Sequence, residues 1–138
     1  MRLELTKRAD YAIRAVLALG GAGPDERLSV RRIATQRAIP VRFLSQVMAD
    51  LVAAGLVEAT EGRTGGYRLA RPATDISLLE VIEAIEGDSR RRICILRGGP
   101  CQLEGVCDVH EVFAAAQEQT IRELSGATIA GLVDRRAG

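Results

Sequence analysis

The residues best suited to chemistry are three cysteines and one histidine that lie in a single short segment, at Cys94, Cys101, Cys107 and His110. They are all the cysteines and the only histidine of this 138-residue chain. Glycines and a proline lie between them, and the segment has no helical or strand period. Because thiolate and imidazole groups bind zinc and iron–sulfur clusters, the segment predicts a metal site or a redox reaction.

The spacing of these ligands favours an iron–sulfur cluster over zinc. A cluster needs four protein ligands; the cysteines supply three, and another residue type must supply the fourth. Zinc sites usually contain two cysteines separated by two to four residues, roughly a single turn of chain, whereas both gaps between these cysteines are longer. Zinc remains an alternative, as does a bare thiol switch that forms a disulfide or a sulfenic acid. An odd number of cysteines makes a disulfide framework unexpected.

Composition favours a small helical protein that stays in the cytoplasm. Hydrophobic residues make up 47% of the chain and aromatic residues only 3%. Aliphatic side chains must therefore build the core, which favours closely packed helices. No apolar run approaches the ~20 residues of a membrane span, and the first residues lack the apolar stretch of a signal peptide. We expect a cytoplasmic protein with no membrane contact, whose thiols stay reduced.

Charge is distributed unevenly along the chain. Residues 1–72 contain 12 Lys or Arg against 7 Asp or Glu, whereas residues 73–138 contain 7 against 11. A basic first half indicates a polyanionic partner. The acidic second half is expected to face solvent or another subunit. The alternative is ordinary variation in surface charge.

The first half has the order of elements typical of a winged helix-turn-helix. Capping and apolar periodicity predict a helix over residues 7–19, a two-turn helix after Ser29, and a third helix over residues 41–54. Two short extended runs within residues 56–70 flank a glycine-rich turn, which predicts a β-hairpin. Residues 1–72 are therefore expected to form a DNA-binding region.

The second half, residues 73–138, is expected to hold the cysteine loop between two helices. Ser77 and Glu80 have the spacing of a capping box, which predicts a helix to about residue 86. The loop spans residues 87–107. A second capping box, Asp108 to Glu111, opens a long helix over residues 108–125, and a final apolar turn or short helix follows over residues 128–133. The fold class is mainly α, with a small β-hairpin wing and a long C-terminal dimerisation helix.

Docked on DNA, the third helix of such a fold places its N-terminal residues in the major groove. Arg42 can read guanine, Gln46 can read adenine, and Ser45 is permissive. Phe43, Leu44 and Val47 are expected to point into the core. The glycine-rich tip of the hairpin lets Arg63 approach the minor groove or the phosphates.

Further basic side chains are candidates for sequence-independent contacts with phosphate groups. These candidates are Lys7, Arg8, Arg31, Arg32 and Arg37. The alternative for each is a solvated position on a helix face.

Several motifs together resemble the Rrf-two family of bacterial transcription regulators, of the IscR and NsrR types. The resemblance runs from Met1 to about Val133. The motifs are LTKRADYAIRA (residues 5–15), IPVRFL (39–44), AGLV (54–57), GRTGGYRLA (62–70), SLLEVIEAIE (77–86) and the three cysteines before the last long helix. One departure concerns the wing, where relatives often have an arginine just before the first glycine. Here Glu61 stands there and Arg63 follows the glycine.

The resemblance implies a homodimer in which the helix from Asp108 crosses to the partner subunit. It also implies a loop-bound iron–sulfur cluster that changes affinity for a palindromic operator in double-stranded DNA. The fourth ligand stays open. His110 matches the IscR type and would suit a [2Fe-2S] cluster. Asp10 matches the carboxylate that the NsrR type takes from the partner subunit, and would suit a [4Fe-4S] cluster.

We therefore expect a DNA-binding regulator, and specifically a repressor, whose cluster senses redox state, nitric oxide or cluster status. One alternative is the same fold acting as a thiol switch or a zinc-containing regulator. Another is an iron–sulfur electron carrier or scaffold whose basic half docks an acidic partner, a reading that the helix-turn-helix and wing oppose. With a single histidine and no nucleophile motif, the sequence offers no catalytic constellation, so we do not expect an enzyme.

Overall fold

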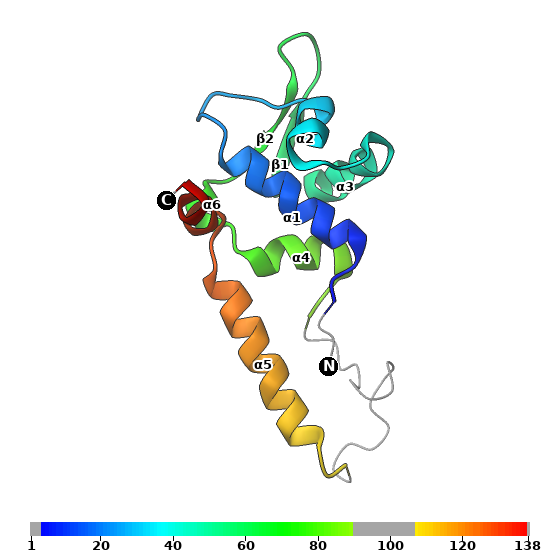
Figure 1. The fold of residues 1–138 in the computed structure, drawn as a ribbon, viewed down its shortest axis with the longest axis vertical. Helices are drawn as coiled ribbons and strands as arrows, with labels where there is room; N and C mark the ends of the chain where they lie inside the picture. The colour runs from blue at the N-terminus through cyan, green and yellow to red at the C-terminus, as the bar shows by residue number, and fades with distance from the viewer. Residues whose placement is uncertain (1–3, 90–106, 138) are drawn as a thin grey trace.

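The computed structural model describes residues 4–89 and 107–137. Its elements in chain order are α1 (Lys7–Gly20), α2 (Val30–Arg37), α3 (Val41–Ala53), β1 (Val57–Thr60), β2 (Gly66–Leu69), the short 3-10 helix η1 (Ala73–Asp75), α4 (Leu78–Glu86), α5 (His110–Gly126) and α6 (Ile129–Ala137). Helix α1 runs through the centre of the body, and α5 projects away from it (Figure 1). The mainly helical fold with a two-stranded hairpin is as predicted.

The core consists of aliphatic side chains gathered around α1. This helix packs against α2, α3, α4 and α6. Its buried face includes Ala12, Ala15 and Val16, all fully shielded from solvent. Small residues allow the neighbouring helices to approach closely. Ile76 and Ile129 are equally shielded and belong to the same core, so both halves of the chain contribute to one packed interior.

The buried stripe of helix α3 leaves out one of the residues that were predicted to point into the core. Its buried residues are Leu44, Val47, Met48 and Leu51. Phe43, which we predicted to point into the core, is 46% exposed, so that prediction is wrong. The spacing of three and four residues along the stripe places Phe43 to one side of it, where its ring stacks on Tyr11 with the centroids 6.4 Å apart.

The wing is tied to the loop before α2. Strands β1 and β2 pair antiparallel, from Val57 opposite Leu69 to Thr60 opposite Gly66. Leu28 and Tyr67 form an additional antiparallel bridge outside the hairpin. This bridge extends the hairpin toward the start of α2, and nothing in the local sequence pattern predicted it.

The second half of the chain begins with the predicted capping box. The Ser77 hydroxyl accepts a bond from the Glu80 N–H at 3.1 Å, and the Glu80 carboxylate accepts from the Ser77 N–H at 2.9 Å. The second predicted capping box is wrong, because Val109 occupies the N-cap position of α5 and no side chain caps it. The long helix accordingly runs from His110 to Gly126 instead of over residues 108–125. The segment predicted as an apolar turn or short helix over residues 128–133 is helical, and α6 continues to Ala137.

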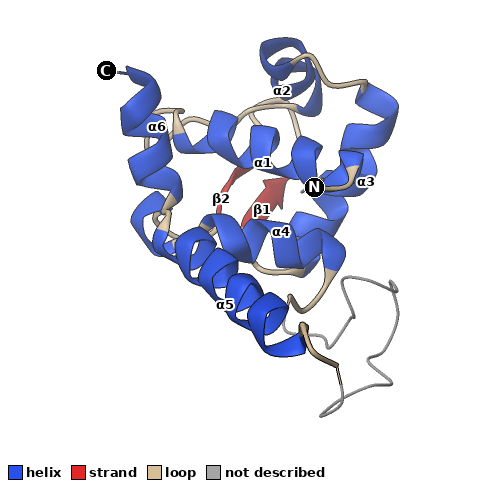
Figure 2. Ribbon diagram, turned by 60° about the horizontal axis from the view of Figure 1, so that its bottom comes forward, coloured by secondary structure: helices blue, strands red, loops and turns tan. Residues whose placement is uncertain are grey.

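Helix α5 runs alongside α4 (Figure 2). Ile121 is its buried residue within the described part of the chain. The Gln117 side chain donates to the Ser89 carbonyl at 2.9 Å, so α5 is also bound to the segment that follows α4. No helix among the described residues is both long and apolar enough to cross a membrane.

Candidate functional site

The face of α3 opposite its buried stripe carries the predicted base-reading residues. Arg42, Ser45 and Gln46 are all exposed and follow one another at helical spacing. The helix begins after Pro40, which occupies the N-cap position. The Ser45 hydroxyl donates back to the Val41 carbonyl at 3.4 Å. The structure therefore groups the three residues on one accessible surface near the start of the helix.

The Arg42 side chain lies against the aromatic ring of Phe43. Its guanidinium carbon lies 4.6 Å from the centre of the Phe43 ring. The ring in turn stacks on Tyr11 of α1, and the Arg14 guanidinium lies over the outer part of that ring system at 5.9 Å from the Tyr11 centroid. A cation over an aromatic face gains roughly 0.5–1 kcal/mol at an exposed site. Phe43, which the sequence pattern placed in the core, thus lies at the surface and helps to orient Arg42.

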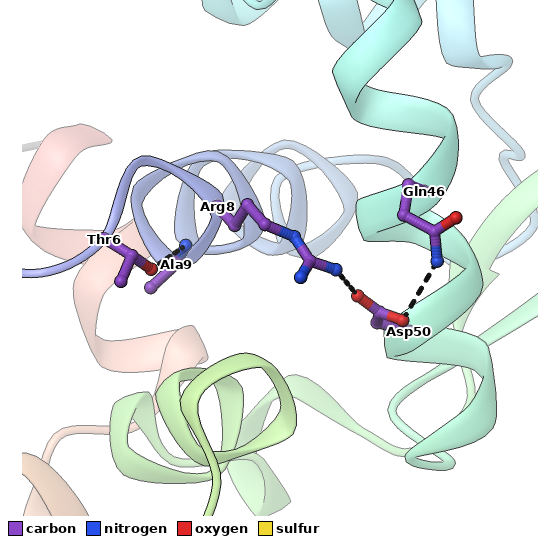
Figure 3. A network of polar contacts seen from close by, with 5 residues as sticks. All are labelled: Thr6, Arg8, Ala9, Gln46 and Asp50. Carbon is purple, nitrogen blue, oxygen red and sulfur yellow. Dashed lines mark hydrogen bonds and ion pairs between the residues drawn. The ribbon is translucent and has the colours of Figure 1, made fainter.

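Gln46 belongs to a polar network that joins α3 to α1 (Figure 3). Its side-chain nitrogen donates to Asp50 Oδ1 at 3.3 Å. The Asp50 Oδ2 atom forms an ion pair with Arg8. Arg8 lies in the first turn of α1, which the Thr6 hydroxyl caps by accepting from the Ala9 N–H at 3.2 Å. Arg8, a predicted phosphate contact, is therefore bound to a carboxylate of its own chain.

The other predicted phosphate contacts differ in their surroundings. Lys7 and Arg31 are exposed and form no ion pair within the described ranges. Arg32 is exposed as well, but it pairs with Glu26 at 3.1 Å. Arg37 is partly buried and lines a pocket of about 230 Å³ beside α1 and α6. Burial, and then the positive charge of Arg136, lower the pKa of the Arg37 guanidinium from its ordinary value.

The turn of the hairpin carries the predicted wing contact. Arg63 is exposed there, with no ion pair among the residues that the structure describes. The turn projects beyond α2, at the end of the molecule opposite α5 (Figure 1). At the base of the wing, Arg68 pairs with Glu58 of the facing strand. Arg63 is thus the wing cation left available to a partner, and Arg68 stabilises the hairpin.

The predicted metal ligands are only partly covered by the structure. Cys94 and Cys101 lie outside the described residues. Cys107 is a free, half-buried thiol three residues before the start of α5. The His110 N–H donates to the Cys107 carbonyl at 3.3 Å, so one backbone turn brings these two residues together at the start of the helix.

Asp10, the alternative fourth ligand, is held within its own helix. Its carboxylate accepts two bonds from Arg14, at 3.1 and 2.6 Å. Arg14 also donates to the Arg37 carbonyl at the end of α2, at 3.3 Å. Among the described residues there is no group of three or more histidine, cysteine or acidic side chains that could hold a metal ion. Within one chain, therefore, Asp10 does not join Cys107 and His110 in a common cluster.

Sequence reasoning missed Asp50 as a member of this surface. The spacing of four residues from Gln46 is compatible with a side-chain contact on a helix. Its other partner, Arg8, lies 42 positions away in the sequence. Only the packing of α1 against α3 brings that pair together.

Comparison with known proteins places the chain in a family. The model of the Rrf2 family, described as an iron-dependent transcriptional regulator, matches residues 5–135. The HTH-type transcriptional regulator NsrR of Geobacillus kaustophilus is 31% identical, over 98% of this chain and 92% of its own.

Two solved structures have the same fold. The global cysteine regulator CymR of B. subtilis aligns with a TM-score of 0.81 at 20% identity, covering 97% of this chain and 98% of that one. IscR of T. potens aligns with a TM-score of 0.77 at 23% identity, covering 97% and 88%. Together with the family match over nearly the whole sequence, these likenesses show that the chain belongs to the Rrf2 family of transcriptional regulators.

Proposed function

We propose that this regulator binds a palindromic operator as a homodimer, as a repressor, and that an iron–sulfur cluster controls its affinity for DNA. The observation that carries the DNA-binding part is the exposed face of α3, where Arg42, Ser45 and Gln46 lie together. These side chains have the hydrogen-bonding groups needed to read base edges in the major groove. The buried stripe on the opposite face holds the helix against the body.

Cations around α3 extend this surface. Arg63 on the wing is proposed to enter the minor groove or to contact phosphates, and Lys7 and Arg31 to contact phosphates. All three are exposed and have no ion pair in the part of the chain described. Arg32 could add a contact by exchanging Glu26 for a phosphate group. Such contacts provide affinity that falls as salt rises.

The proposed dimer uses the side of α5 that the chain itself leaves uncovered. Val112 is 70% exposed, and Val109, Ala116 and Thr120 are also exposed. Ile121 packs within the chain, whereas Val112 points to the opposite side at ~100° of rotation per residue. Burying these apolar side chains against a partner would be favourable by roughly 25 cal/mol per Å² of apolar surface removed from water. A second copy of α5 would cover these residues.

Two of the proposed cluster ligands lie among the residues that the structure describes. Cys107 and His110 lie one turn apart at the N-terminus of α5, where free N–H groups favour negative charge by ~0.3–1 kcal/mol. Cys94, Cys101 and Cys107 would hold the cluster, with His110 or the partner subunit's Asp10 as fourth ligand. To serve, Asp10 would have to give up its two bonds from Arg14. When bound, the cluster would supply a redox-active iron centre, and its oxidation, its reaction with nitric oxide or its loss would be the signal.

The second candidate is a thiol switch on the same fold. Its support is Cys107 itself, a free thiol that remains partly accessible to solvent and hence to oxidants. A structural zinc site with three cysteines and His110 is the third possibility. Iron, sulfide and zinc content distinguish all three.

Anaerobic purification followed by visible and Mössbauer spectroscopy tests the cluster. We expect a brown protein whose visible absorption is lost in Cys101→Ala. A colourless protein with one zinc per subunit would identify the zinc form, and a colourless protein without metal would leave the thiol switch. The spectrum also separates [2Fe-2S] from [4Fe-4S].

Gel-shift titration with the promoter region of the chain's own gene tests the DNA interface. Arg63→Ala should weaken binding without changing cluster content, and Arg68→Ala provides the control on the same hairpin whose cation is already paired. Equal affinity of Arg63→Ala and the unaltered protein would remove the wing from the interface. Absence of sequence-dependent binding by both holo and apo protein would favour the electron carrier or scaffold.

A further inference from the structure

We propose that Asp50 determines base specificity by fixing the side-chain amide of Gln46, and that Arg8 holds Asp50 in place for this task. The proposal rests on the function proposed above, in which α3 reads DNA. In this role Asp50 itself contacts neither a base nor a phosphate group. Arg8 acts through Asp50 and is a positioning residue.

The two oxygens of the Asp50 carboxylate are engaged by different helices. Gln46, one turn earlier on α3, donates to Oδ1 at 3.3 Å, and Arg8 of α1 pairs with Oδ2. The Asp50 side chain is 29% exposed, whereas that of Arg8 is 52% exposed. Asp50 is thus less exposed than Arg8, and it links Arg8 of α1 to Gln46 of α3 (Figure 3).

A carboxylate beside Gln46 decides which end of the amide faces the groove. A glutamine amide has a donor end and an acceptor end of nearly the same shape, so both orientations fit a given space. An ionised carboxylate only accepts hydrogen bonds. The Gln46 nitrogen must therefore face Asp50, and its oxygen points away from Asp50 (Figure 3).

This orientation matches the requirement for reading adenine. Adenine presents an N6 amino donor and an N7 acceptor in the major groove, and a glutamine bonds both with its oxygen and one N–H. Gln46 uses one of its two N–H groups on Asp50 and keeps the second, together with its oxygen. With the amide reversed, the oxygen would face the carboxylate, which is repulsive. Asp50 thereby removes the orientation that would read a different base edge.

Arg8 makes an acidic residue tolerable at a surface that must approach phosphates. An unpaired carboxylate on α3 would repel the DNA backbone, and Arg8 neutralises it across the contact between α1 and α3. Arg8 arises from a helical turn that Thr6 caps, so its backbone is fixed. The ion pair also restrains the Asp50 side chain in the position that Gln46 needs.

The test is selection of binding sites from a randomised duplex DNA library by the intact dimer, followed by sequencing. Gln46→Ala should lose the preference for one base per half-site, by about fivefold or more. Asp50→Ala should lose the preference at that same position and at no other. Asp50→Asn, which preserves shape but can both donate and accept, should reproduce the loss. The double variant Asp50→Ala with Gln46→Ala should be no worse than Gln46→Ala alone.

Glu26→Gln is the matched control. It removes one carboxylate that pairs with an arginine, Arg32, but it lies outside α3. It should leave every base preference unchanged. Circular dichroism and thermal unfolding of each variant establish that the protein is folded, and Asp50→Asn provides a mild substitution should Asp50→Ala unfold.

Arg8 is tested by salt dependence as well as by base preference. As a positioning residue, Arg8→Gln should weaken the base preference at the Gln46 position, whatever its effect on overall affinity. A slope smaller by about one, with the preference intact, would make Arg8 a phosphate contact and overturn its assigned role.

The outcomes separate this proposal from the function on which it rests. Retention of the base preference in Asp50→Ala and Asp50→Asn, with its loss in Gln46→Ala, would overturn the role of Asp50 while α3 remained the reading helix. Failure of the unaltered protein to enrich any sequence would instead overturn the proposed function itself.

Discussion

Leu28 and Tyr67 exchange both of their backbone hydrogen bonds, at 2.9 and 2.8 Å, and so join the loop before α2 to the second strand of the wing. Gly66 lies against this bridge. A β-carbon at that position would lie 2.9 Å from the Leu28 carbonyl oxygen, and the glycine has a φ of 140°. The wing therefore has a fixed position relative to the helix-turn-helix because a glycine precedes Tyr67.

Gly66→Ala should destabilise the protein and loosen the wing. We expect a loss of at least ~1–3 kcal/mol in the free energy of unfolding, since backbone strain adds to the contact with Leu28. Chemical denaturation measures this loss. Gly62→Ala is the control, because its φ of 102° is also strained but a β-carbon there meets nothing within 4 Å. Equal losses in the two variants would show that the close approach to Leu28 adds nothing to the backbone strain.

Glu80→Gln should reduce stability in a pH-dependent manner. Burial acts to raise the pKa of Glu80, but hydrogen bonds from Arg71 and from Ser77 outweigh it, and the pKa is lowered overall. A lowered pKa in the folded state means that ionised Glu80 stabilises the fold above the usual glutamate pKa of about 4.3. This contribution is lost as pH falls through the lowered value.

This pH dependence can be checked by chemical unfolding of the unaltered protein and of Glu80→Gln at several pH values across the acidic range. The two should differ by roughly 0.2–1 kcal/mol near neutral pH, because Gln keeps an oxygen that can accept from the Ser77 N–H but loses the ion pair with Arg71. They should converge as the solution becomes acidic. Ser77→Ala removes the other half of the capping box without removing a charge. A difference that stayed constant with pH would contradict the assigned role of the Glu80 charge.

The two capping boxes show which parts of the fold could be predicted from the sequence. Ser77 and Glu80 are three residues apart, so local geometry suffices for them to bond, and that prediction is confirmed. Asp108 and Glu111 have the same spacing, but α5 begins later and Val109 takes the N-cap position. The start of a helix depends on the conformation of the residues just before it, here Asp108 and Val109 in a turn, and periodicity does not specify that conformation.

Contacts between distant segments account for most of what the sequence pattern missed. Hydrophobicity alone placed Phe43 in the core, but the stacking partner that accommodates it at the surface, Tyr11, belongs to another helix. Arg8 was predicted as a free cation because its partner, Asp50, is far along the chain. The reading residues Arg42, Ser45 and Gln46 were predicted to share a face because they lie within one helix, where spacing determines direction.

Val112→Glu should dissociate the proposed dimer. The substitution places a charge among the exposed apolar residues of α5, on the side opposite Ile121. Sedimentation velocity of the variant should give the mass of one chain at concentrations where the unaltered protein is dimeric. Arg122→Gln changes net charge by the same amount at another exposed position of α5 and should remain dimeric. Dimerisation of Val112→Glu at unchanged affinity would place the interface elsewhere.

The most direct measurement is the affinity of one anaerobic preparation for duplex DNA from the promoter region of its own gene, before and after removal of the cluster. We expect the holo and apo proteins to differ by at least tenfold, which corresponds to about 1.4 kcal/mol of coupling between the two sites. We also expect Cys101→Ala to bind this DNA with the affinity of the apo protein, both before and after the cluster-removal step. Equal affinity of the holo and apo forms would contradict control of operator binding by an iron–sulfur cluster.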